Sequence, residues 1–329
     1  MPLYLKQETM TNQTVLVTGG TGFVGVHTIL RLLQKGYTVK TTVRSLAKKE
    51  AIVQALNESG IVDLDQLSYV EADLTADEGW EDAARGCTYV LHVASPFPLV
   101  PPEDENELII PARDGSLRVL KAARKADVKR VVMTSSFAAI GYSIDPSGHT
   151  FTENDWTDEN AQVQAYIRSK TIAEKAAWNF IRDQGEGLEL TVINPVGIFG
   201  PIIGGIFPAS YEGVIKALVD GTVTESPQFT FGVVDVRDVA DIHIKAMVLP
   251  EAKGQRFLAT SDSVVSFYDV AQLIKKERTQ KAGMIAELKP IDSTYYINMS
   301  NQKAKDMLDR YPRSKEEAIL ASLDSEIPA

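Results

Sequence analysis

The stretch Val15-Leu-Val-Thr-Gly-Gly-Thr-Gly-Phe-Val-Gly25 decides how this chain folds. A short apolar run comes directly before glycines at 19, 20, 22 and 25, and an apolar, helix-like run follows them. Glycines are needed here because a strand turns tightly into a helix and the backbone must come close to a pyrophosphate. The first N–H groups of the helix then face the anion. The stretch therefore predicts a strand, a turn and a helix that together bind a dinucleotide.

Strand-like and helix-like runs go on alternating after this stretch. Short apolar strands are expected at Thr38–Val43, Leu67–Val70, Tyr89–Val93, Lys129–Thr134 and Leu188–Asn194, with helix-like runs between them. Near-continuous apolar strands are typical of a parallel sheet that helices cover on both faces. We predict an α/β fold: a doubly wound parallel sheet of the Rossmann type with a smaller C-terminal substrate-binding lobe.

The rhythm changes after Pro195, where Gly- and Pro-rich loops take over. We expect a cofactor-binding Rossmann domain over residues 12–200 and a mainly substrate-binding lobe over 201–329. Phe229–Val239 and Arg256–Ala259 look able to return to the first sheet. The first domain is therefore expected to regain chain near 229–262.

Composition argues against several classes of function. The 329 residues carry 34 Lys and Arg against 44 Asp and Glu, a net charge of −10, without a basic block. We therefore expect no nucleic-acid or membrane partner. The single cysteine, Cys87, excludes a disulfide within the chain, and the 4 histidines lack metal-ligand spacing, so no metal is expected. The long uncharged run Leu190–Tyr211 is interrupted by prolines, and a cytoplasmic protein is the expectation.

The residue that follows the second predicted strand bears on the choice of dinucleotide. A carboxylate there would accept a hydrogen bond from the ribose 2′-hydroxyl, whereas an arginine would pair with a 2′-phosphate. Arg44 stands at this place, and Lys48 and Lys49 follow within a turn. This favours NADP(H) over NAD(H).

A tyrosine and a lysine share one face of a helix expected over Asn160–Gln184. Tyr166 and Lys170 are spaced i and i+4. An unperturbed tyrosine titrates near pH 10, and a neighbouring cation stabilises its phenolate and lowers that value. Ser135 and Ser136 stand at the end of another predicted strand, where ligands bind in a doubly wound sheet. These residues are candidates for acid–base chemistry.

Taken together, these motifs resemble the extended short-chain dehydrogenase/reductase superfamily. The resemblance rests on Thr18-Gly-Gly-Thr-Gly-Phe-Val-Gly25, Asp73-Leu74, His92-Val-Ala-Ser-Pro96, Thr134-Ser-Ser136, Tyr166-x-x-x-Lys170 and Asn194-Pro195. Within it, the chain is most similar to the branch that holds dihydroflavonol and cinnamoyl-CoA reductases and microbial aldehyde and ketone reductases. The subgroup clues include Val234-Asp-Val-Arg-Asp-Val-Ala240 and Pro312-Arg-Ser314.

The resemblance implies hydride transfer from a reduced nicotinamide to a carbonyl carbon. Tyr166 would give a proton to the carbonyl oxygen, Ser136 would hydrogen-bond the same oxygen, and Lys170 would hold down the pKa of Tyr166. The cofactor-binding residues it implies are Gly19, Thr21, Gly22, Phe23, Val24, Gly25, Arg44, Lys48, Asp73, Leu74, Ala94, Ser95, Tyr166, Lys170, Pro195 and Val196.

The expected substrate pocket lacks the polar residues that the hydroxyl groups of a flavonoid would need. Its candidate lining is Phe97, Phe137, Ile140, Tyr142, Ile202, Phe207 and Tyr211. Such a lining suits an apolar or aromatic aldehyde or ketone.

Two other functions remain open at this stage. A nucleotide-sugar epimerase or dehydratase that uses NAD would share the glycines, Ser136 and the tyrosine–lysine pair, but many of these enzymes carry an acid where Arg44 stands. A non-catalytic dinucleotide sensor would typically lose Tyr166 or Lys170. The expected partner is a small carbonyl compound, and the chain is expected to be a monomer or a homodimer.

Overall fold

The computed structural model describes residues 13–96, 102–309 and 312–325. The strands of these residues are β1 (Thr14–Thr18), β2 (Thr38–Val43), β3 (Leu67–Glu71), β4 (Tyr89–His92), β5 (Arg130–Thr134), β6 (Thr150–Phe151), β7 (Glu189–Pro195), β8 (Gly197–Phe199), β9 (Phe231–Asp235), β10 (Arg256–Ala259), β11 (Val264–Val265) and β12 (Asn298–Met299). The α-helices are α1 (Phe23–Gln34), α2 (Lys49–Glu58), α3 (Trp80–Ala84), α4 (Asn106–Lys125), α5 (Ala165–Gln184), α6 (Ala217–Val219), α7 (Val236–Val248), α8 (Phe267–Glu277), α9 (Gln302–Leu308) and α10 (Lys315–Asp324).

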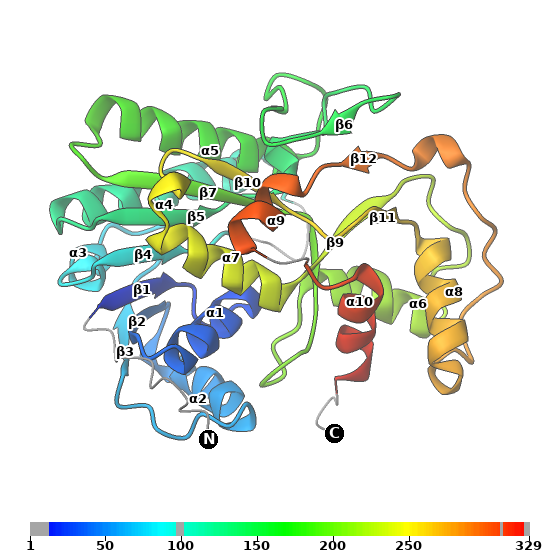
Figure 1. Ribbon diagram of the computed structural model, residues 1–329, viewed down its shortest axis with the longest axis horizontal. Helices are drawn as coiled ribbons and strands as arrows, with labels where there is room; N and C mark the ends of the chain where they lie inside the picture. The colour runs from blue at the N-terminus through cyan, green and yellow to red at the C-terminus, as the bar shows by residue number, and fades with distance from the viewer. Residues whose placement is uncertain (1–12, 97–101, 310–311, 326–329) are drawn as a thin grey trace, which may run out of the picture.

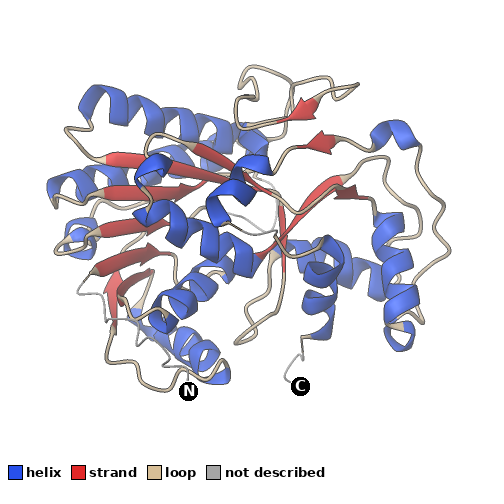
Figure 2. Ribbon diagram, in the orientation of Figure 1, coloured by secondary structure: helices blue, strands red, loops and turns tan. Residues whose placement is uncertain are grey.

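A seven-stranded sheet forms the centre of the molecule, in the order β10-β7-β5-β4-β1-β2-β3 (Figure 2). Every pair in it is parallel. The chain runs outward from β1 to β3 and then starts again at β4 on the other side of β1. This reversal leaves a crevice at the carboxyl ends of β1 and β4, where doubly wound folds bind ligands. The predicted doubly wound parallel sheet is confirmed.

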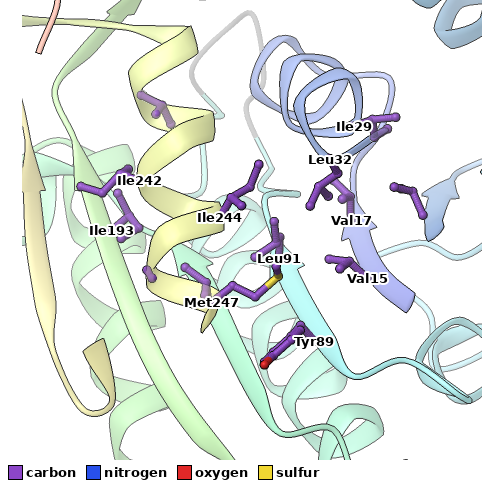
Figure 3. Close-up of a cluster of buried hydrophobic side chains, with 14 of the residues drawn as sticks. Val15, Val17, Ile29, Leu32, Tyr89, Leu91, Ile193, Ile242, Ile244 and Met247 are labelled. Carbon is purple, nitrogen blue, oxygen red and sulfur yellow. The ribbon is translucent and has the colours of Figure 1, made fainter. Parts of the chain in front are cut away.

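Helices cover both faces of this sheet (Figure 1). Alternate strand residues point to opposite faces, so Val15 and Val17 of β1 join one buried cluster and Leu16 joins the other. The first cluster includes side chains of α1, α2, α7 and α9, and Figure 3 shows its centre, where Leu32 of α1 and Ile244 of α7 lie over the sheet. The second cluster includes side chains of α3, α4 and α5. Burial on both faces explains why these strands are apolar almost throughout.

Beyond the large sheet, a separate group of elements, the second cluster of elements, has a hydrophobic core of its own, distinct from the two clusters on the faces of the large sheet. A three-stranded sheet, β11-β9-β8, packs with a π-helix at Tyr211–Lys216 and with α6, α8 and α10. The expected return of Arg256–Ala259 to the first sheet occurs, because β10 pairs with β7. The expected return of Phe229–Val239 is wrong for its strand, since β9 pairs with β8 and β11, while α7, which follows it, covers the large sheet.

Two further findings concern helices. The helix expected from Asn160 begins only at Ala165, because Gln164 before it has extended backbone. Among the helices of the described residues, none has the length and apolar character needed to cross a membrane.

Candidate active site

In the glycine turn after β1, neighbouring backbone lies so close that only glycine fits at two positions. Gly19 has φ +72°, and a Cβ there would lie 2.9 Å from the Cα of Ala94. A Cβ on Gly25 would lie 2.2 Å from the carbonyl oxygen of Gly19. Thr18 joins the ends of β1 and β4, since its Oγ1 accepts from the N–H groups of Val93 and Ala94, each at 3.0 Å. The turn thus sits at the crevice of the sheet.

Helix α1 begins with its backbone donors open to a ligand. Gly22 is the N-cap and brings no capping side chain, and the first turn holds no acidic residue. The first N–H groups of a helix lack partners within the helix and attract an anion. Gly22, Phe23, Val24 and Gly25 all line the same cavity. This start of α1 is therefore suited to a pyrophosphate.

The cavity has a volume of about 820 Å³ and follows the carboxyl edge of the large sheet. It runs past residues that follow β2 and β3, past the glycine turn, and on to residues beside β5 and β7. The predicted cofactor residues that line it are Gly19, Thr21, Gly22, Phe23, Val24, Gly25, Arg44, Asp73, Leu74, Ala94, Ser95, Tyr166, Lys170 and Val196. Lys48 and Pro195 are not in the lining: Lys48 is exposed on a 3-10 helix after Arg44, and Pro195 is buried in β7.

At the β2–β3 end of the cavity, the exposed Arg44 lies near the carboxylate of Asp73. Arg44 forms no hydrogen bond and no ion pair with the residues that the structure describes. Hydrogen bonds from Thr75, together with the nearby charge of Arg44, hold the pKa of Asp73 below its ordinary value. Because the Arg44 side chain makes no hydrogen bond or ion pair among the described residues, it is available to a phosphate group.

Trp80, the first residue of α3, also lines this end. Its indole is almost fully buried, and Nε1 donates to the carbonyl oxygens of Asp73 and Ala76, each at 3.0 Å. It thereby holds the turn that carries Asp73. A tryptophan at the start of a short helix gives no sequence signal for such a role.

Three predicted catalytic residues meet at the β5–β7 end. Ser136 follows β5, and Tyr166 lies in the first turn of α5 with Lys170 one turn further on. Tyr166 and Ser136 share a side-chain hydrogen bond. The Nζ of Lys170 lies over the Tyr166 ring, 5.9 Å from its centre. Tyr166 and Lys170 both face the cavity.

Ser135 and Ser136 have different surroundings. Ser135 lines the cavity, and its buried Oγ has no hydrogen-bond partner within the described chain. The Oγ of Ser136 accepts from the N–H of Ala138 at 3.1 Å and is bonded to Tyr166. Of the two hydroxyl groups, that of Ser136 is the one coupled to the tyrosine.

Burial dominates the titration of the pair on α5. It lowers the pKa of Lys170 to about 8, against a smaller opposing effect of Glu174. It raises the pKa of Tyr166, while the hydrogen bond from Ser136 acts in the opposite direction. The net shift of the Tyr166 pKa is therefore upward, although Lys170 was expected to hold this pKa down, because burial outweighs the groups that favour the phenolate. A raised value keeps the phenol protonated at neutral pH, as a proton donor requires.

The expected substrate pocket is only partly where the sequence placed it. Phe207 lines the cavity, together with Pro96, Val196, Ile198, Pro208 and Ala209. Tyr211 and Ile202 instead pack in the core of the second cluster of elements, and Phe137 and Ile140 form a small core with Phe151. Tyr142 is half-exposed and packs its ring against Phe137, outside the lining. Phe97 lies outside the described residues.

Most of the apolar side chains predicted for the pocket lie outside the cavity lining, for a simple reason. Sequence position does not tell whether an aromatic residue of a loop faces a cavity or a core, and burial in a core is the commoner outcome.

Ionisable side chains show no cluster suited to a metal ion in the part of the chain that is described.

Known proteins match this chain in both sequence and structure. The model of the NAD dependent epimerase/dehydratase family matches residues 15–258. Tetraketide alpha-pyrone reductase 2 of Arabidopsis thaliana is 34% identical over 271 residues, which cover 80% of this chain and 82% of the relative. Cinnamoyl-CoA reductase CAD2 of Medicago truncatula is 32% identical over 301 residues and 89% of each chain.

Among solved structures, the yeast methylglyoxal/isovaleraldehyde reductase Gre2 in complex with NADPH superposes with a TM-score of 0.83. It is 29% identical in sequence, and the match covers 94% of this chain and 97% of that one.

Proposed function

The chain belongs to the NAD dependent epimerase/dehydratase family, and from this premise we propose that it is an NADPH-dependent reductase of small, uncharged aldehydes or ketones. The observation that carries the proposal is one cavity lined by the glycine turn, Arg44 and Tyr166. Ser136 lies outside the lining and is hydrogen-bonded to the Tyr166 side chain. Reductases among the relatives support the same reaction class.

NADP(H) is the cofactor that these residues fit. The turn at Gly19 and Gly25 leaves no room for a side chain. Such a turn lets the backbone come close to a pyrophosphate. The exposed guanidinium of Arg44 would hold the 2′-phosphate, with Lys48 nearby on the following 3-10 helix. NADPH in the complex of the yeast relative supports this choice.

The protein's own part in the reaction is to place a proton and a charge. When bound, the reduced nicotinamide supplies the hydride. The phenol of Tyr166 donates its proton to the carbonyl oxygen as negative charge develops there, and Ser136 donates a hydrogen bond to the same oxygen. The ammonium group of Lys170, buried beside the tyrosine ring, stabilises the phenolate that remains.

The lining of the β5–β7 end indicates the kind of substrate. Pro96, Val196, Ile198, Phe207 and Pro208 offer apolar contact, and the hydroxyl of Ser210 is engaged by the carbonyl oxygen of Ile198. Arg44 and Lys170 are the cations of the described lining, and both are assigned to cofactor and tyrosine. A substrate phosphate or carboxylate therefore has no described partner, which favours an uncharged carbonyl compound.

The test is the oxidation of NADPH, followed by absorbance, with a panel of aliphatic and aromatic aldehydes, ketones and diketones. NADH is run in parallel, and a UDP-sugar is offered as an alternative substrate. Turnover of uncharged carbonyls with NADPH is the expected result. Conversion of the nucleotide sugar would transfer the assignment to an epimerase, and tight cofactor binding without any turnover would favour a sensor.

A further inference from the structure

A buried ion pair lies directly behind the candidate catalytic residues. Glu174 is on α5, one turn after Lys170, and is fully buried. Its Oε1 accepts from Nε of Arg256 at 2.6 Å and from Nε1 of Trp178 at 3.2 Å. Its Oε2 accepts from Nδ2 of Asn194 at 2.7 Å. A carboxylate buried to this degree is costly unless several donors satisfy it.

Asn194 links this carboxylate to the segment that begins at Ser136 and continues into the 3-10 helix Phe137–Ala139, which we call the serine loop. Its Nδ2 also donates to the backbone carbonyl of Ser136, at 3.1 Å. One amide group on β7 thus connects α5, which carries Tyr166 and Lys170, with the residue whose hydroxyl bonds Tyr166. The two amide protons have one acceptor each, so the amide is held in one orientation.

Arg256 holds the other side of the same loop. Its guanidinium donates to the carbonyl oxygens of Glu153 and Asp155, each at 2.7 Å, and lies 3.7 Å from the centre of the Trp156 ring. The strand β10 is the edge strand of the large sheet. Arg256 therefore ties that edge to both α5 and the segment that follows the serine loop.

We propose that Glu174 is a positioning residue, which acts through Asn194 to hold the Ser136 loop against α5 and sets the charge beside Tyr166 through Lys170. The proposal rests on the proposed function, because it assigns a role toward the same Ser136, Tyr166 and Lys170. Glu174 does not line the cavity, so its proposed role is indirect.

The charge of Glu174 acts on Lys170 against burial. Burial lowers the pKa of Lys170 to about 8, and Glu174 is the charged group that raises it. The other ionisable groups near Lys170 are Tyr166, whose pKa is raised, and His92 of β4, whose pKa burial lowers to about 3. Glu107 of α4 lines the same cavity, and Arg256 of β10 pairs with Glu174. Of Lys170, Tyr166 and His92, Lys170 is thus the one whose charge changes between pH 6 and 9.

Glu174→Gln tests the proposal, with Glu189→Gln as its matched control. Glu189 pairs with the buried Arg130 at 2.6 Å, on the same large sheet but at the amino-terminal ends of β5 and β7. Both variants neutralise a carboxylate that is paired with a buried arginine, and only one of the two pairs lies behind the site. Folding of each is checked by circular dichroism and thermal unfolding.

We expect Glu174→Gln to lower kcat roughly ten- to a hundredfold, with a smaller change in the KM for the carbonyl. The alkaline limb of the pH profile should move down by about one pH unit, because Lys170 loses the charge that keeps it protonated. The pH at which NADPH binding weakens, measured by fluorescence, should move in the same direction. Glu189→Gln should change none of these.

A folded Glu174→Gln protein with unchanged kcat and pH profile would overturn the proposal, and so would equal shifts in Glu189→Gln. If Glu174→Gln does not fold, Asn194→Ala takes its place. That variant should lower kcat but leave the alkaline limb where it is, since Glu174 keeps its charge; unchanged kcat would overturn the link.

Failure of the proposed function would be seen separately, as absence of carbonyl turnover in the native protein. The pH dependence of NADPH binding would still test the effect of Glu174 on Lys170 in that case.

Discussion

Tyr166 and Lys170 show how strongly the surroundings of a side chain can shift its pKa from the value usual for that residue type. Both groups are buried beside the cavity, which raises the pKa of the phenol and lowers that of the ammonium group to about 8. In the direction of reduction the phenol must be protonated, so its raised pKa is an advantage. In the direction of alcohol oxidation the phenolate is needed, and that rate should rise with pH.

Tyr166→Phe should lower the rate of carbonyl reduction by orders of magnitude and leave NADPH binding in place. The phenol is the proton donor, and loss of a general acid costs roughly 10² to 10⁴ in rate. Turnover is measured by absorbance and binding by fluorescence titration. Unchanged turnover would remove Tyr166 from the mechanism.

Arg44→Asp should reverse the preference for the phosphorylated cofactor. The carboxylate repels a 2′-phosphate and accepts from a ribose 2′-hydroxyl, and a charge-assisted contact is worth roughly 1.5–3 kcal/mol, or about ten- to a hundredfold in affinity. The ratio of kcat/KM for NADPH and NADH is the measurement. An equal loss with both cofactors would give Arg44 a structural role instead.

Helix α5 carries an amino group that the fold must bury. It packs against α4 and the serine loop, and Lys170 at 7% exposure has lost most of its water. In an unfolded chain the same lysine titrates near pH 10.4. Between about pH 8 and that value, the unfolded state binds more protons than the folded one, so stability should rise with pH across this window.

Lys170→Met should therefore raise the stability of the ligand-free protein at pH 7 while it destroys activity. The gain is at most on the order of 3 kcal/mol, since one pKa unit corresponds to about 1.4 kcal/mol. Urea unfolding at pH 7 and pH 10 measures it, and the difference between wild type and variant should shrink at the higher pH. A variant that is less stable than wild type at pH 7 would contradict the argument.

At the scale of the whole molecule, buried histidines join segments that are far apart in the sequence. His27 of α1 bonds the carbonyl oxygen of Pro201 at 2.9 Å, at the start of the loop that leads to Phe207. His92 bonds Thr18 at 2.9 Å, and His243 bonds Thr134 at 2.7 Å. Burial lowers the pKa of His27 and His243 to about 4 and that of His92 to about 3.

Acid should unfold the protein steeply. Between about pH 6.5 and 4, these three histidines are protonated in the unfolded chain and neutral in the folded one, so stability falls as the pH falls. The slope is up to about 4 kcal/mol per pH unit, from about 1.4 per proton. Urea unfolding at several pH values checks it. In His92→Asn, whose amide oxygen can still accept from Thr18, the slope should drop by about one proton; a slope equal to that of wild type would contradict this assignment.

Much of the fold and part of the site could be read from local patterns. Apolar runs of strand length, separated by helical runs, determined the doubly wound sheet, since covering both faces requires strands such as Val15–Val17 to be apolar throughout. The glycine turn and the i, i+4 spacing of Tyr166 and Lys170 are likewise local, because steric demands and helix geometry act over a few residues.

Other features were decided only by the tertiary structure, because they depend on which surfaces meet. The partners of β9 and the place of Tyr211 in a core join segments far apart in the sequence. So does the Glu174–Arg256 pair, which spans 82 residues. The amino-acid sequence by itself determined the fold class and the residues of the dinucleotide turn; burial, which sets the pKa of Lys170 and the lining of the cavity, arises only when the distant elements pack together.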